Sequence, residues 1–131
     1  MIDHVSIPVR DLTRAAAFYD RVLAPLSLRQ LVKRERTIGY GAKYPEFWLN
    51  LRDGAIARED SGHHVCLRAP SEAAVSEFFA NALNCGGRGD GDPVPRQGAV
   101  TTYFAAFVLD PDGNKIEAVT FPRTNPTTIN E

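Results

Sequence analysis

The sequence predicts an α+β domain made of two copies of one strand–helix–strand–strand–strand unit, and three observations support this. The chain repeats at an offset of 60 residues, so that His4 and Phe18 recur as His64 and Phe78. Each histidine opens a short alternating run, typical of a half-buried strand, that leads into an amphipathic helix. Residues 110–113, Asp-Pro-Asp-Gly, strongly favour a hairpin turn between two further alternating runs. A repeat at a fixed period predicts two stacked structural copies.

The first unit, residues 1–57, begins with an alternating strand over 2–9. Asp11 is the expected N-cap of a helix whose apolar residues recur at helical spacing. Pro25 ends that helix, because proline lacks the amide hydrogen that a helix interior needs. Three strands complete the unit, at residues 27–34, 36–42 and 46–52.

The second unit, residues 61–121, repeats this order. Its first strand is expected to carry His64, Cys66 and Arg68 on one face, and Ser71 to cap the following helix. The buried stripe of that helix is predicted to consist of Val75, Phe78, Phe79, Ala82 and Leu83. Residues 86–98, rich in glycine and proline, are expected to form a loop able to close over a ligand. Two last strands, TTYFAAFVL and NKIEAVTF, flank the turn, and 122–131 is a polar tail.

Size and composition indicate a single soluble domain over residues 1–131. The apolar fraction of 44% and charged fraction of 24% are ordinary for a globular protein. With a net charge of −1, the sequence lacks the excess of positive charge that binding to nucleic acid or an anionic membrane would need. No apolar run reaches the length that spans a membrane. The N-terminus does not resemble a signal peptide, and two cysteines suit a reducing compartment, so we expect a cytoplasmic protein.

Strand parity suggests a metal site. If the apolar strand faces lie on the helices, the other faces line a common cavity that contains His4, His64 and Glu117. Two imidazoles and one carboxylate bind a divalent ion and leave positions open for substrate. The alternative is that each histidine is a locally hydrogen-bonded strand residue. Their repeat-equivalent positions favour the metal, with Fe²⁺, Mn²⁺, Ni²⁺ and Zn²⁺ as the candidate ions.

The chain resembles the vicinal oxygen chelate superfamily, which includes glyoxalase I, bleomycin-resistance proteins, fosfomycin-modifying thiol transferases and extradiol dioxygenases. Three segments carry the resemblance: DHVSIPVRDLTRAAAFYDRVLAPL, GHHVCLRAPS and FVLDPDGNKIEAV. The resemblance implies two βαβββ modules around a cup-shaped cleft formed by mixed sheets. It also implies that His4, His64 and Glu117 are the metal ligands. Glu117 is in addition the candidate catalytic residue.

At some positions the sequence differs from the family pattern, and these differences narrow the range of reactions that we expect. Glyoxalase I uses a fourth carboxylate ligand on the last strand of its first module, where this chain offers Trp48 and Asn50. Glu46 has the right parity but lies at the mouth of the strand, so it is the remaining candidate for a fourth ligand. We therefore expect glyoxalase I activity to be weak or absent. His63, the only other histidine, is expected to point away from the cavity.

The predicted function is a metal-dependent enzyme that chelates a small oxygen-rich substrate and catalyses isomerisation, thiol addition or ring-cleaving oxygenation. Candidate substrate-binding residues are Trp48, Asn50, Arg68, Tyr103 and Lys115, with Trp48 and Tyr103 as an aromatic wall. The alternative function is a metal-free protein that sequesters a drug or metabolite. We expect a homodimer in which modules pair across the two chains, because the link over 53–62 is short.

Overall fold

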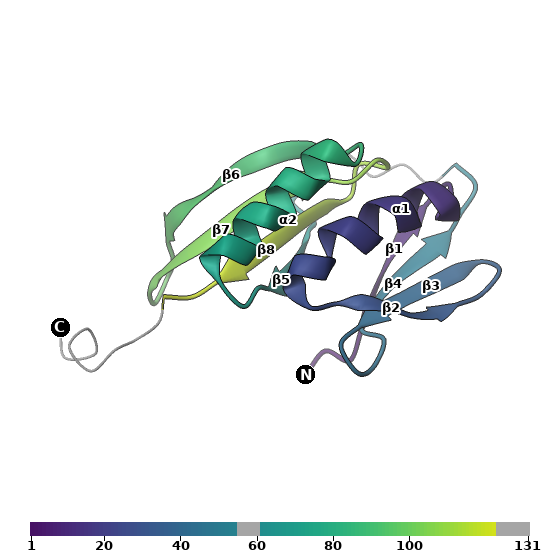
Figure 1. The fold of residues 1–131 in the computed structure, drawn as a ribbon, viewed down its shortest axis with the longest axis horizontal. Coiled ribbons are helices and arrows are strands. Elements are labelled where there is room, and N and C mark those ends of the chain that lie inside the picture. The colour runs from purple at the N-terminus through teal and green to yellow at the C-terminus, as the bar shows by residue number, and fades with distance from the viewer. Residues whose placement is uncertain (55–60, 123–131) are drawn as a thin grey trace.

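Two βαβββ modules follow each other along the chain in the computed structural model, which describes residues 1–54 and 61–122. The first contains β1 (Val5–Val9), α1 (Leu12–Val22), a short 3-10 turn (Ala24–Leu26), β2 (Arg29–Lys33), β3 (Thr37–Gly41) and β4 (Phe47–Leu51). The second contains β5 (Val65–Arg68), α2 (Glu72–Asn84), β6 (Arg88–Gln97), β7 (Thr102–Leu109) and β8 (Lys115–Thr120). The predicted α+β class and doubled unit are thereby confirmed (Figure 1).

Each module forms a mixed four-stranded sheet of the same topology. The strand orders are β1-β4-β3-β2 and β5-β8-β7-β6, so the first and last strands of each module lie side by side and run parallel. In both modules this parallel pair places the start of the first strand beside the last strand. The topology thus gives His4 and His64 equivalent places in their two modules.

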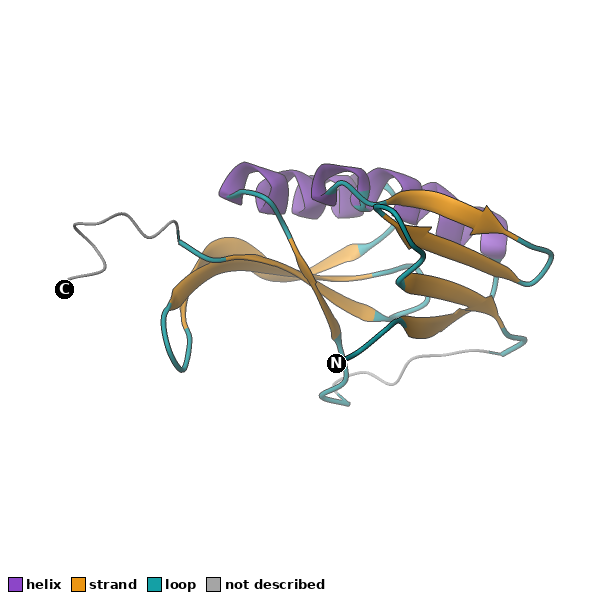
Figure 2. Ribbon diagram, turned by 90° about the horizontal axis from the view of Figure 1, so that it is seen from below, coloured by secondary structure: helices purple, strands orange, loops and turns teal. Residues whose placement is uncertain are grey.

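The two helices form one layer, and both sheets lie on the same side of it (Figure 2). The core fills the space between these layers and includes the fully buried repeat pair Phe18 and Phe78. Both predicted N-caps are confirmed: the Asp11 side chain accepts from the Arg14 amide at 3.0 Å, and Ser71 accepts from the Ala74 amide at 3.1 Å. The sheet faces that point away from the helices remain available for a site.

Helix α1 ends at Val22, and Pro25 lies just beyond it in the 3-10 turn, as expected from its missing amide hydrogen. The prediction that Leu83 belongs to the buried stripe of α2 is wrong, because this side chain is 48% exposed. Its repeat equivalent Leu23 is fully buried, and the two positions differ in that α1 ends before Leu23, whereas α2 continues through Leu83 to Asn84.

The predicted ligand-covering loop over residues 86–98 is also wrong, since most of it is β6. This strand lies at the sheet edge, where a proline that cannot donate a ladder hydrogen bond is tolerated. Its pairing with β7 shifts register on both sides of Gly91. A side chain at Gly91 would lie only 2.8 Å from Phe107 Cδ1, so close packing explains this glycine. Residues 86–98 therefore form part of the sheet.

The predicted turn between β7 and β8 is confirmed and also joins the two modules. The buried Asp110 side chain accepts from the Asn114 backbone amide at 2.8 Å, which closes the turn. The Tyr19 hydroxyl of α1 donates to the same carboxylate at 2.6 Å. Asn114 Nδ2 donates to the Pro8 carbonyl at 2.9 Å, and Arg14 pairs with the buried Asp112 at 2.9 Å. The turn thus fixes the second module against the first.

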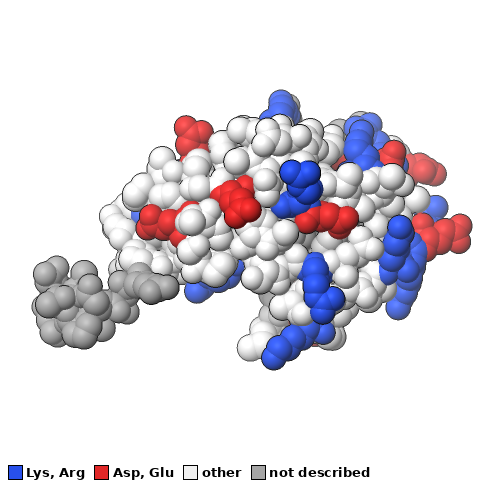
Figure 3. Space-filling model, viewed as in Figure 1, with Lys and Arg blue, Asp and Glu red and all other residues white. Residues whose placement is uncertain are grey.

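On the helix side of the molecule, acidic and basic side chains are both present on the surface (Figure 3). This agrees with the formal net charge of −1. Neither described helix has the length and apolar character that a membrane crossing requires. The predicted tail and the middle of the inter-module link lie outside the described residues, so the predicted module boundaries stay a prediction.

Candidate functional site

The structure brings together two of the three predicted metal ligands. His64 Nε2 and Glu117 Oε1 lie 2.9 Å apart, on the sheet face opposite the helices. The Glu117 side chain is only 8% exposed, whereas that of His64 is 37% exposed. Glu117 lies on the central strand β8, with Cys66 directly opposite on β5 and Phe107 directly opposite on β7. A nearly buried carboxylate is thus held beside an accessible imidazole.

His4 lies near this pair without joining it. Its ring contacts its neighbour, with Nδ1 2.6 Å from Asp3 Oδ1. His4 and His64 both line one pocket of about 590 Å³ between the starts of β1 and β5. Across the described ranges, 1–54 and 61–122, no three histidine, cysteine or acidic side chains are grouped closely enough to hold a metal. Within one chain, His4 is therefore separate from the His64–Glu117 pair.

His63 also lines this pocket, as do neighbours of both strand parities such as Val65 and Cys66, so the direction of its ring stays a prediction. His63 lies in the segment that precedes β5, which begins at Val65. Its backbone amide donates to Ser61 Oγ at 3.2 Å. Glu46 also lines this pocket and is thus placed near His4 at the start of the strands.

Cys66 is a neutral thiol beside the carboxylate. Burial, followed by the neighbouring charge and hydrogen bond of Glu117, raises the pKa of Cys66 to about 12. A protonated thiol is a weak nucleophile, because the thiolate is the reactive form. Cys66 therefore places a protonated thiol directly opposite Glu117 on the neighbouring strand.

The register of the two sheets identifies the residue of the first module that corresponds to Glu117. Cys66 pairs with Glu117, and its repeat equivalent Ser6 pairs with Trp48. Trp48 therefore occupies the position that corresponds to Glu117. Gly39 leaves space for the indole, since a Cβ there would lie 2.9 Å from the ring. The first module thus presents an aromatic surface where the second presents a carboxylate.

The other first-module candidates have distinct surroundings. Asn50 lies opposite Pro8 and Thr37, two residues beyond Trp48 along β4. The Arg34 guanidinium carbon lies 5.9 Å from the centre of the Trp48 ring. A positive charge thus accompanies the aromatic surface.

Phe107 is a site residue that the sequence reasoning missed. Its ring centre lies 5.7 Å from that of His64, 4.9 Å from Lys115 Nζ and 5.1 Å from the Arg96 guanidinium carbon. The signal was present: the turn at 110–113 fixes the antiparallel pairing of the flanking strands, which places residue 107 opposite Glu117. Phe107 therefore lies beside His64 and carries two cationic side chains, Lys115 and Arg96, close to its ring.

The predicted substrate-binding residues of the second module separate into two groups. Lys115 forms an ion pair with Asp90, with 3.0 Å between Nζ and Oδ2. Arg68 lies over the ring of Phe121 at 4.5 Å, and that ring packs at 6.1 Å against Tyr103. Tyr103 thus packs against Phe121. Its predicted partner in an aromatic wall, Trp48, lies on β4 of the other module.

Comparisons with known proteins agree with this architecture. The sequence profile of the Glyoxalase/Bleomycin resistance protein/Dioxygenase superfamily matches residues 1–118. A lactoylglutathione lyase of Salmonella typhimurium is 31% identical over 125 residues, covering 88% of this chain and 89% of the relative.

Solved structures show the same fold. A glyoxalase/bleomycin resistance protein from Albidiferax ferrireducens superposes with a TM-score of 0.80 at 30% identity, over 89% of this chain and 96% of the other. The fosfomycin resistance protein FosX from Mesorhizobium loti superposes with a TM-score of 0.65 at 18% identity, over 100% of this chain and 98% of the other. At that identity the second likeness concerns the fold alone.

Proposed function

This chain belongs to the glyoxalase/bleomycin resistance protein/dioxygenase superfamily, and we propose that it is an enzyme that binds one divalent metal through His4, His64 and Glu117. The observation that carries the proposal is the 2.9 Å approach of His64 Nε2 to Glu117 Oε1. An imidazole nitrogen and a carboxylate oxygen are donors that suit Fe²⁺, Mn²⁺, Ni²⁺ and Zn²⁺. Their convergence on a half-open sheet face fits an ion that keeps positions free for substrate.

The bound ion would supply Lewis-acid polarisation of a chelated substrate oxygen. The protein residues orient and shield that substrate. Cys66 lies directly opposite Glu117 on β5, and its protonated thiol would help to position the carboxylate, as groups behind metal ligands commonly do. Phe107 excludes water from one side of the pair, and Trp48 offers an aromatic surface on the other module.

We place His4 in this site from a second copy of the chain. The 60-residue repeat makes His4 and His64 equivalent, yet the described residues of one chain contain no cluster of three ligands. The helices cover only one face of the two sheets, which leaves the opposite faces for another copy. A homodimer with two shared clefts would satisfy both observations, with an obligate interface above about 2,000 Å².

The reaction we propose is isomerisation, thiol addition or oxygenation of a small oxygen-rich substrate. The relative from Salmonella typhimurium is a lactoylglutathione lyase, but we expect that activity to be weak or absent here. Trp48 stands in the position that is equivalent to Glu117, so the carboxylate base implied by a resemblance to glyoxalase I is missing.

A second candidate function is metal-free binding of a drug or metabolite. The cluster of Phe107, Lys115 and Arg96 supports it, because aromatic and cationic groups can hold an anionic ligand without a metal. In that case the His64–Glu117 contact would be an ordinary hydrogen bond. Metal analysis of protein purified without a histidine tag separates the two functions.

Calorimetric titration with Mn²⁺, Ni²⁺ and Zn²⁺ tests the metal proposal directly. Glu117→Gln should weaken binding by at least about tenfold, because it removes the only anionic ligand. Glu77→Gln, an exposed glutamate on α2, should leave affinity unchanged and serves as the matched control. Equal affinities for wild type and Glu117→Gln would refute the proposal.

A further inference from the structure

The second-module sheet face carries more positive than negative charge around the proposed metal ligands. Residues paired across β5, β8 and β7 share this face with Glu117, and their cations are Arg68 and Lys115, with Arg96 joining from β6. The negative partners are fewer: Glu117 contacts His64, and Asp90 neutralises Lys115. A ligand bound here would therefore meet an excess of positive charge.

The three cations differ in how far their hydrogen-bonding groups are already used. Arg96 donates to the backbone carbonyls of Ala105 at 3.2 Å and Asp92 at 2.7 Å. Lys115 is held by its ion pair. Within the described residues Arg68 makes no hydrogen bond or ion pair, and its guanidinium carbon lies 4.5 Å from the centre of the Phe121 ring. Arg68 is thus the cation most available to a ligand.

The contact of Arg68 with the Phe121 ring leaves its guanidinium N–H groups available to bind a planar anion. A guanidinium that lies on an aromatic ring uses its flat face for that contact, so its N–H groups remain free in the plane. These groups match the two oxygens of a carboxylate in a bidentate pair. Phe121 is 42% exposed and packs against Tyr103, so a ligand bound to Arg68 would also cover apolar surface.

The distance of Arg68 from the metal ligands sets the size of the ligand. Arg68 pairs with Val119, two residues beyond Glu117 on β8. At about 3.3 Å per residue, the two positions are separated by about 7 Å along the strands. This separation suits a short molecule that reaches Glu117 with one end and Arg68 with the other.

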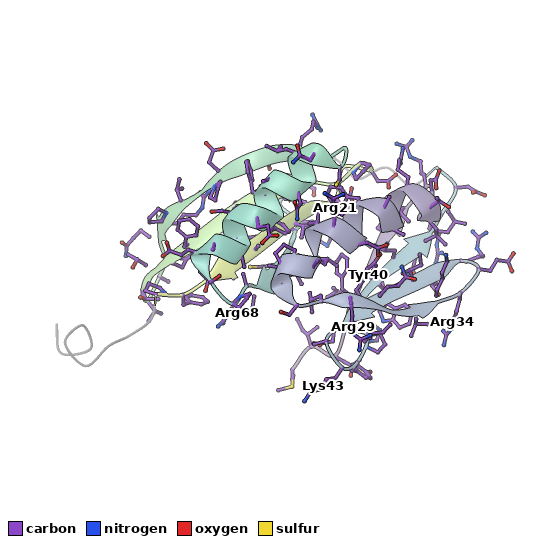
Figure 4. The ribbon with its side chains drawn as sticks, in the orientation of Figure 1. Arg21, Arg29, Arg34, Tyr40, Lys43 and Arg68 are labelled. Atoms are coloured by element: carbon purple, nitrogen blue, oxygen red, sulfur yellow. The ribbon has the colours of Figure 1, made fainter. Side chains whose placement is uncertain are left out.

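We propose that Arg68, stacked on Phe121, binds a carboxylate of the substrate, so that the substrate is a small acid with chelating oxygens at its opposite end. This rests on the proposed function only in placing a chelating group at His64 and Glu117. Figure 4 shows Arg68 at the end of β5, well away from Arg21 of α1, which serves as a control arginine on the helix layer.

Two probe acids isolate the contribution of the carboxylate. 2-Oxoglutarate and 2-oxopentanoate share the same chelating end and chain length, but only the first has a distal carboxylate. Calorimetry with Mn²⁺-loaded protein should show 2-oxoglutarate binding on the order of tenfold to a hundredfold more tightly. Arg68→Gln should remove that preference, Arg68→Lys should retain part of it, and Arg21→Gln should leave it intact.

The same titrations with a chelator present separate the two proposals. If Mn²⁺ strengthens neither acid, the metal proposal fails, while the ratio between the acids still reports on Arg68. A wild-type protein that does not prefer 2-oxoglutarate, or that binds neither acid, would overturn the role of Arg68. A preference that survives Arg68→Gln would overturn it equally.

Discussion

Removing the Tyr19 hydroxyl should loosen the joint between the two modules. Tyr19 and Asp110 are both buried, and the hydroxyl donates to Asp110 Oδ2 at 2.6 Å. Tyr19→Phe keeps the ring and its packing against Phe18 and Phe47, at 4.9 and 5.2 Å, so the change is confined to the hydrogen bond. Losing a buried hydrogen bond to a charged acceptor costs about 1.5–3 kcal/mol.

This loss should depend on pH. Burial raises the pKa of Asp110 above its usual 3.8, and the hydrogen bond from Tyr19 opposes that rise by favouring the ionised carboxylate. Above the pKa of Asp110 the carboxylate is charged and the contribution of Tyr19 is complete. As the pH falls through that pKa the carboxyl becomes neutral and the contribution shrinks. Tyr19→Phe should therefore cost more free energy at pH 7 than near about pH 4.

Urea unfolding at both pH values measures the effect, with Tyr40→Phe as the matched control. The Tyr40 hydroxyl donates to Asp20 at 2.7 Å, but this contact lies within the first module and is only part-buried. Its loss should cost about 0.5–1.5 kcal/mol. If Tyr19→Phe lost no more stability than Tyr40→Phe, or lost the same amount at both pH values, the coupling of the modules through Asp110 would be wrong.

Three further outcomes are expected. Lactoylglutathione lyase assays of the wild type should find no turnover in the usual enzymatic range of about 1–10³ s⁻¹. A rate in that range would show that this activity does not need a carboxylate at the position of Trp48. Mixing His4→Ala with His64→Ala protein should partly restore metal binding, because exchanged dimers regain one intact cleft; no recovery after proven exchange would mean that each chain builds its site alone. Gly41→Ala should lower stability by about 1–3 kcal/mol in a thermal melt, since a Cβ there would clash with the Tyr44 carbonyl oxygen; an unchanged melting temperature would show that the segment around Tyr44 adjusts freely.

Local patterns predicted the fold because each depends on neighbouring residues. Asp11 and Ser71 cap their helices through amides only three residues away. Residues 86–98 were misjudged for the opposite reason: their composition favours a loop, but pairing with β7 decides their conformation. Leu83 likewise followed helical periodicity, although its exposure depends on where the helix ends relative to the sheet.

The sequence predicted the site only where the 60-residue repeat and the alternation of side chains along the strands point to the same residues. His64 and Glu117 meet because parallel pairing of β5 and β8 follows from the doubled topology. Phe107 could have been found by extending the hairpin register from the turn. The relation of His4 to that pair depends on how two modules, or two chains, are arranged, which no short-range pattern encodes.

Trp48, at the first-module position that corresponds to Glu117, also gives the protein a fluorescent reporter. The chain has a single tryptophan, so its indole fluorescence arises from one half-buried ring on the site face of β4. The guanidinium of Arg34 beside that ring makes its emission sensitive to local charge. Changes in emission colour or lifetime therefore describe the first-module surface alone, without any introduced dye.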